Sequence, residues 1–277
     1  MKLPPKMRAI VGNISLGFAV FVVVSPSILV FLWMLSLALK TEIENTAYPP
    51  IFIPRAPTLE NFTNVMAKGR FFLYLWNSII VSGVSTIAAL IVGVPAGYGI
   101  ARARAHRLAA LVLVSRITPG LSYLIPMFIL FRYFDLLGSL LPMVIIHMVI
   151  TLPIVIWVMV GFFEAIPQDL DEAAEIDGCR PWQAFWHIAL PLSRAGITVS
   201  AILAFIFSWN NFVFGIVLTG RETRTLPVAV YNSLSFEQIA WGPLAASALI
   251  VTLPVLIVTI LAQKEIVDGL MSGGLKG

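Results

Sequence analysis

Residues 139–163 read SLLPMVIIHMVITLPIVIWVMVGFF, a run that contains no Lys, Arg, Asp or Glu. A helix rises 1.5 Å per residue, so about 20 mostly apolar residues cross the hydrocarbon core of a bilayer. This run is long enough to do so, and it predicts a membrane-spanning helix.

Five further stretches of the chain have the same length and apolar character. They lie at about 15–39, 75–101, 108–131, 197–219 and 243–263. Across all 277 residues, 59% belong to the hydrophobic set and 12% are charged, a balance unusual for a soluble protein. The first stretch is too long for the apolar part of a signal peptide, about 7–15 residues. The sequence therefore predicts an all-α integral membrane protein: one domain over 1–277 with six transmembrane helices.

Basic residues near helix ends indicate the orientation, because Lys and Arg favour the cytoplasmic side. The densest short cluster, Arg102, Arg104 and Arg107, lies between the second and third stretches, and the chain begins with Lys2, Lys6 and Arg8. Both termini are then expected to be cytoplasmic. Basic inner loops also account for the net charge of +4, so no nucleic-acid partner is expected.

The longest expected inner segment, 164–194, differs in composition from the apolar runs around it. Pro167 can open a helix, and Gly178 can end it in a left-handed turn. Pro181 can begin a second short helix, with Pro191 near its end. The segment predicts an elbow of two short helices joined at a glycine.

The second arm of this elbow carries three large aromatic residues, Trp182, Phe185 and Trp186. Exposing them in water is costly unless something covers them. The cover could be the protein's own helix ends or a soluble partner.

The spacing Glu172-Ala173-Ala174-x3-Gly178-x9-Ile188-x-Leu190-Pro191 resembles the signature of permease subunits of ATP-binding-cassette importers. Other short motifs of the chain are similar to those of the carbohydrate-importer branch of this family, in particular to the second maltose-type permease. They are Asn77-Ser78, Tyr98-x3-Arg102, Trp209-Asn210 and Gly269-x3-Gly273-x2-Lys276-Gly277. The family often has an acid after Trp-Asn, whereas Asn211 stands here.

The resemblance implies that segment 164–194 is a cytoplasmic coupling loop that seats in a cleft of an ATPase dimer. The residues implied to couple are Glu172, Ala173, Ala174, Gly178, Ile188, Leu190 and Pro191. The tail 264–277 is expected to reach into the ATPase pair. A second homologous permease subunit and a periplasmic or extracellular solute-binding protein complete the implied assembly, in the bacterial inner membrane.

The chain itself carries no recognisable energy source or catalytic centre. It has no G-x4-G-K-[ST] phosphate loop, so ATP and Mg²⁺ are expected on the partner ATPase. The three histidines, His106, His147 and His187, show no metal-ligand spacing. We therefore expect no catalytic residue, no metal site and no cofactor in this chain.

Polar residues inside the expected spans are the candidates for solute contact, because a polar group in hydrocarbon normally faces a cavity or another helix. Arg116 falls eight residues after the start of the third span, about 12 Å into a core of roughly 30 Å. It could be a snorkelling or paired side chain, or a cavity residue that faces an anionic or hydroxylated solute. Ser208, Trp209, Asn210 and Asn211 are expected near the middle of the fifth span. They could contact a sugar or form hydrogen bonds between helices.

The main hypothesis is a permease for a sugar or sugar-derived solute. A polyol, a glycerol phosphodiester, or an acidic or sulfonated sugar would use the same machinery. An ATP-independent secondary transporter is a different class, but the six expected spans contain no Asp or Glu for a carboxylate ion relay. An integral-membrane enzyme is disfavoured by the missing nucleophile and metal set.

Overall fold

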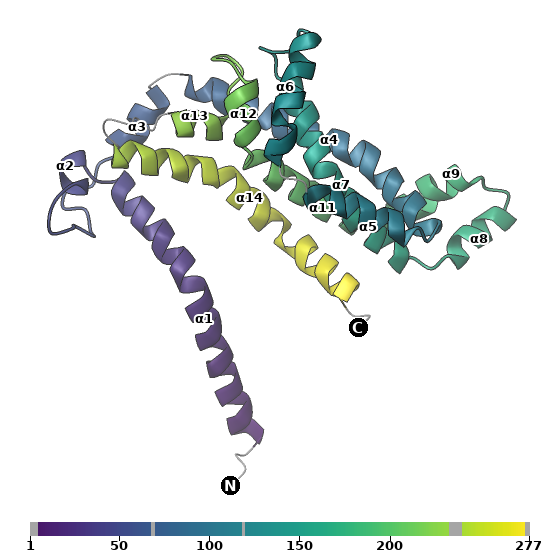
Figure 1. Ribbon diagram of the computed structural model, residues 1–277. Coiled ribbons are helices and arrows are strands. Elements are labelled where there is room, and N and C mark those ends of the chain that lie inside the picture. Colours follow the sequence, from purple (N-terminus) through teal and green to yellow (C-terminus); the bar gives the residue numbers. More distant parts are fainter. Residues whose placement is uncertain (1–4, 68–69, 118–119, 233–239, 275–277) are drawn as a thin grey trace. The chain divides into compact units, whose positions relative to one another are not determined.

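The computed structural model describes residues 5–67, 70–117, 120–232 and 240–274, and all regular structure in these ranges is helical (Figure 1). By internal contacts the chain forms two compact units, residues 1–69 with 233–250 and residues 70–232 with 251–277. Lys2, Lys6 and Arg8 near one end and the motif at 269–277 near the other are affected by the limits of the description: residues 2, 276 and 277 lie outside the described ranges, and side chains are described only between residues 15 and 264.

The first unit contains α1 (Pro5–Ala38), α2 (Glu42–Asn45), α3 (Glu60–Ala67) and the beginning of α14 (Trp241–Gly274). The second unit contains the rest of α14 and the remaining elements. These are α4 (Phe71–Arg102), α5 (His106–Val114), η1 (Ser115–Ile117), η2 (Gly120–Tyr123), α6 (Leu124–Tyr133), α7 (Leu141–Ala165), α8 (Asp169–Ile176), α9 (Pro181–Ala184), η3 (Phe185–Ala189), α10 (Leu190–Leu192), α11 (Arg194–Trp209), α12 (Val213–Leu218) and α13 (Leu226–Asn232).

Four described helices are long and apolar enough to cross a membrane: α1 from Ser15, α4, α7, and α14 as far as Lys264. They correspond to the expected spans 15–39, 75–101, 139–163 and 243–263. Two bent helix pairs are also long and apolar enough together: His106–Ile117 with Gly120–Tyr133, and Pro181–Leu192 with Arg194–Trp209. If each pair counts as one span, the number of spans rises to as many as six.

The helices expected at 108–131 and 197–219 are interrupted in the structure. The first range is divided between His106–Ile117 and Gly120–Tyr133, with an angle of 83° between the halves. The second is divided at Asn210–Phe212, between α11 and α12. At this break the Asn210 side chain donates to the Ile206 carbonyl, 3.0 Å away, so an amide competes with the helical backbone. Apolar composition does not reveal such breaks, because the residues on both sides remain hydrophobic.

The core of the second unit lies where α4 packs against α7. A Cβ added at Gly93 would lie 2.6 Å from the Val155 Cγ1, and one at Gly97 would lie 2.8 Å from the Met159 Cβ. The two glycines therefore let the helices approach closely, as small residues at this spacing do in membrane proteins. Val155 and Met159 are fully buried in this contact.

In the first unit, polar side chains hold the ends of the helices together. The Asn61 amide donates to the carbonyls of Ala38 and Lys40 at 2.9 and 2.7 Å. The Glu42 carboxylate accepts from the backbone N–H groups of Trp241 and Gly242, at the beginning of α14. A carboxylate there complements the positive end of the helix dipole.

We predict that Gly97→Ala destabilises the protein, because its methyl group would overlap Met159. Overpacking of this kind costs roughly 1–3 kcal/mol, so the midpoint of thermal unfolding in detergent should fall. Gly99→Ala is the matched control, since a Cβ at Gly99 on the same helix meets nothing within 4 Å. Equal midpoints for the two variants would contradict the close α4–α7 contact.

Candidate functional site

The first arm of the elbow, α8, ends in a turn that depends on Gly178. The Gly178 backbone has φ +87°, a conformation that L side chains rarely adopt. The Cys179 N–H donates to the Ala174 carbonyl at 2.9 Å, and the Gly178 N–H donates to the Glu175 carbonyl at 3.0 Å. These two bonds form the Schellman arrangement that satisfies the last carbonyls of a helix. The turn therefore fixes the direction in which the chain leaves α8.

The second arm begins at Pro181, where the Gln183 side chain accepts the Arg180 N–H at 2.8 Å. It continues from α9 through the π-helical stretch η3 into α10, which contains Pro191. The arm then bends by 76° into α11. In Figure 1, α8 and α9 lie side by side at one end of the second unit.

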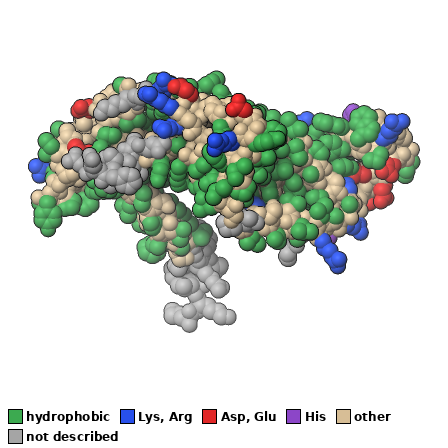
Figure 2. Space-filling view, turned by 45° about the horizontal axis from the view of Figure 1, so that its top comes forward, with side chains coloured by type: hydrophobic (Ala, Val, Ile, Leu, Met, Phe, Trp, Pro, Cys, Tyr) green, Lys and Arg blue, Asp and Glu red, His purple; other side chains and the backbone are tan. Residues whose placement is uncertain are grey.

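The elbow exposes an apolar surface, although not all of its aromatic residues take part. Phe185 is buried, with its ring centroid 5.0 Å from that of Tyr98 on α4. Ile176 is 87% exposed, and Trp182 and Trp186 are 58% and 56% exposed. The protein's own helices therefore cover one of the three aromatic residues and leave two uncovered. Figure 2 shows acidic side chains gathered at the same end of this unit, among hydrophobic ones.

The residues of the sequence signature lie in two environments. Glu172, Ala173, Gly178 and Pro191 are exposed, Ala174 is buried, and Ile188 and Leu190 are half-buried. Leu190 packs against the core between α4 and α7. The signature thus combines exposed positions on the arms with apolar positions that attach the second arm to the helices.

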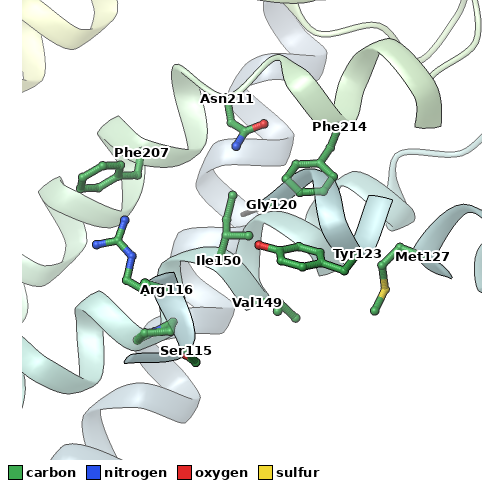
Figure 3. A pocket seen from close by; sticks show the side chains of 11 residues that line it. Ser115, Arg116, Gly120, Tyr123, Met127, Val149, Ile150, Phe207, Asn211 and Phe214 are labelled. Carbon is green, nitrogen blue, oxygen red and sulfur yellow. The ribbon is translucent and has the colours of Figure 1, made fainter. Parts of the chain in front are cut away.

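A cavity of about 350 Å³ lies where the two broken segments of the second unit meet (Figure 3). One side of its lining comes from the first broken segment and from α6: Ser115, Arg116, Gly120, Tyr123 and Met127. The rest comes from α7 and from the second break with its flanks: Val149, Ile150, Pro153, Phe207, Asn211 and Phe214. No carboxylate occurs among these described lining residues.

Arg116 enters this cavity from the bend rather than from the middle of a straight helix. Its guanidinium carbon lies 4.9 Å from the centroid of the Phe207 ring, a cation–π contact. Figure 3 shows the guanidinium pointing toward that ring, and the side chain is exposed. No ion pair of Arg116 is present in the described part of the chain.

The opposite wall of the cavity is aromatic and carries polar atoms. Tyr123 and Phe214 stack with ring centroids 5.6 Å apart and planes at 19°. The Asn211 Oδ1 is buried and has no partner among the described residues. A guanidinium, a carboxamide and a phenol hydroxyl therefore line the cavity beside three aromatic rings, groups that suit hydroxylated solutes.

The other three candidates from the fifth span lie outside the cavity lining. The Ser208 hydroxyl is buried, 3.0 Å from the Ser85 hydroxyl and 2.8 Å from His147 Nδ1. Trp209 is 1% exposed and donates from Nε1 to the Val251 carbonyl on α14. Asn210 is exposed and bonds back to its own helix. Ser208 and Trp209 thus hold helices together.

Sequence reasoning missed the aromatic residues that line the cavity, Tyr123, Phe207 and Phe214. They come from stretches predicted as continuous helix, and nothing in their spacing distinguishes them from lipid-facing residues. The structure also contains no group of three His, Cys, Asp or Glu side chains that could hold a metal ion among its described residues.

Comparison with known proteins places these features in a family. The family model described as "Binding-protein-dependent transport system inner membrane component" matches residues 89–264, which include both the elbow and the cavity. The chain is 34% identical to the sulfoquinovosyl glycerol transport system permease protein of Agrobacterium fabrum, over 89% of this chain and 88% of that protein. It is 33% identical to the trehalose transport system permease protein of Mycobacterium tuberculosis, over 92% and 94%.

The fold is also that of a solved transporter chain. A chain in the crystal structure of a bacterial ABC transporter involved in the import of the acidic polysaccharide alginate matches with a TM-score of 0.74. The match covers 95% of this chain and 99% of that one, at 21% identity. With the family model covering well over half of its length, the chain belongs to the family of inner membrane components of binding-protein-dependent transport systems.

Proposed function

We propose that this permease forms half of the translocation pathway of an ATP-driven importer for a sugar or sugar-derived solute. The observation that carries the proposal is the elbow. Two short helices, fixed by the Gly178 turn, present Ile176, Trp182 and Trp186 to the outside while Phe185 is anchored on α4. An exposed apolar surface of this kind indicates a protein partner.

The partner of this surface is an ATPase dimer, and the elbow is the coupling loop that passes its closure to the helices. The chain has no phosphate loop of its own, so the nucleotide and Mg²⁺ bind to that separate subunit. A second homologous permease supplies the other half of the pathway, and an external binding protein delivers the solute. The helix α14 continues to Gly274, in keeping with a tail that approaches the ATPase pair.

The cavity around Arg116 supports a sugar as the solute, since aromatic rings and amides suit sugar faces and hydroxyls. Relatives named for trehalose and sulfoquinovosyl glycerol transport agree with that class. One observation favours an acidic or sulfonated sugar as a second candidate: the Arg116 guanidinium faces a cavity whose described lining contains no carboxylate. A sulfonate or carboxylate on the solute would supply the missing negative charge.

The Gly178 turn provides the test of coupling. In proteoliposomes that contain the whole importer, Gly178→Val should lower the amount of solute moved per ATP hydrolysed. A left-handed conformation costs a side-chain residue of order 1–2 kcal/mol, and relief of that strain would redirect the arm. A Cβ at Gly178 meets nothing within 4 Å, so the effect would come from the backbone alone.

Gly138→Val is the matched control for this variant. Gly138 has φ +91°, also has nothing within 4 Å of an added Cβ, and lies in the turn before α7, away from the elbow in the sequence. It should show the same backbone strain without the loss of coupling. Wild-type transport per ATP in Gly178→Val would exclude the elbow as the coupling element.

Arg116 provides the test of the anionic solute. Arg116→Lys should weaken transport of a sulfonated or carboxylated sugar, because an ammonium loses the planar fork that binds such groups in two places. Arg116→Ala should abolish that transport while leaving basal ATP hydrolysis and assembly intact. Unchanged uptake, or failure to assemble, would remove the case for an anionic solute.

Two neighbouring amides test whether the solute contacts the cavity lining, with one of them as the control for the other. Asn211→Ala removes a lining group, whereas Asn210→Ala removes one that bonds to its own helix. We expect the first to raise the KM for solute and the second to leave it unchanged. Uptake kinetics with the binding protein at saturation measure both.

We further propose that both termini and the elbow are cytoplasmic, and the single thiol tests this. Cys179 is free and half-buried next to the Gly178 turn. It should resist an impermeant maleimide on intact cells and react in inside-out vesicles after the ATPase is removed. Tyr48 is 96% exposed and lies between the first and second spans, which puts it on the outer face if the N-terminus is cytoplasmic. Tyr48→Cys in a Cys179→Ser background should therefore show the opposite pattern. Labelling of Cys179 from outside would reverse the topology.

A further inference from the structure

Arg102, at the C-terminal end of α4, joins three elements of the second unit. Its Nη1 donates to the carbonyls of Phe163 and Ile166, at 3.0 and 3.1 Å, where α7 ends. Its Nε forms an ion pair with the Asp171 carboxylate on α8. The last carbonyls of a helix lack helical partners and carry its negative dipole end, so a cation there is stabilising.

Tyr98, one turn earlier on α4, extends this contact to both arms of the elbow. Its hydroxyl donates to the Asp171 carboxylate at 3.3 Å, and its ring lies 5.4 Å from the Arg102 guanidinium. The same ring packs against Phe163 of α7 at 5.3 Å and against Phe185 of the second arm at 5.0 Å. The pair Tyr98–Arg102 therefore contacts α7, α8 and η3 together.

Asp171 differs from the other acids of α8. The side chains of Arg102 and Asp171 are only 16% and 13% exposed, so the pair is partly shielded from water. Asp169, Glu172 and Glu175 are exposed, and none of them forms an ion pair within the described part of the chain. Removing one partner of a shielded pair leaves the other charge uncompensated, which is far more disruptive than losing an exposed charge.

We propose that Tyr98, Arg102 and Asp171 form a positioning clamp that makes α8 move together with the ends of α4 and α7. An isolated helix of eight residues is not stable by itself, so it transmits a displacement only if it is fixed to something rigid. Without the clamp, the ATPase would still engage α8, but its movement would reach the spans only through the second arm and the chain that joins α8 to α7. This inference rests on the proposed role of the elbow as the coupling loop.

The test is the ratio of solute transported to ATP hydrolysed, measured in proteoliposomes with the complete importer. Asp171→Asn keeps the shape of the side chain and removes its charge, so we expect the ratio to fall severalfold below that of the wild type. Asp171→Glu should restore most of it. Asp169→Asn is the matched control, because it removes an acid from the same helix turn without touching Arg102.

A double-mutant cycle separates the clamp from independent effects of its members. If Asp171 acts through Arg102, adding Arg102→Gln to Asp171→Asn should lower the ratio little further. A general loss of folding would lower transport and ATP hydrolysis together and leave the ratio unchanged. Such a result, or a ratio in Asp171→Asn equal to that of Asp169→Asn, would overturn the clamp.

The outcome for the clamp can be told apart from the outcome for the proposed function. Gly178→Val reports on the elbow as a whole, and Asp171→Asn reports on its attachment. If Gly178→Val uncouples transport and Asp171→Asn does not, the elbow couples by another attachment. If neither does, the coupling role itself fails.

Discussion

Every backbone polar group inside a bilayer must find its hydrogen-bond partner within the protein, and this constraint shapes the structure. It explains the long unbroken helices α4 and α7. It also explains where helices are allowed to break. The bend that carries Arg116 and the break that carries Asn211 line the same cavity, in keeping with the rule that irregular backbone at membrane depth is tolerated where it lines an internal space. The breaks therefore mark the proposed solute pathway.

The same two helices connect this pathway to the elbow. Val149 and Ile150 of α7 line the cavity, while Phe163 at its other end provides a carbonyl for Arg102. At 1.5 Å per residue these positions are about 20 Å apart along one helix. Close packing at Gly93 and Gly97 holds α4 to α7 over part of this length. A displacement of the elbow can thus reach the cavity through a stiff pair of helices rather than through loops.

The signature of the elbow acquires a physical explanation from this arrangement. Gly178 supplies a left-handed turn, and Ala174 is a small buried residue behind it. Leu190 and Phe185 attach the second arm to the core, while Asp171 attaches the first arm to Arg102. The exposed Trp182 and Trp186 remain for the partner. In the proposed function, attachment and docking are therefore carried by different residues of one short segment.

The sequence by itself determined the features that depend on local chemistry. Apolar runs predicted the long helices, and proline and glycine predicted the two arms of the elbow. Tertiary structure alone decided which side chains meet. The meeting of Arg116 and Asn211 in one cavity, the burial of Ser208 and Trp209, and the pairing of Arg102 with Asp171 all depend on residues far apart in the chain. Hydropathy averages over a window, and it carries no information on which helix faces which neighbour.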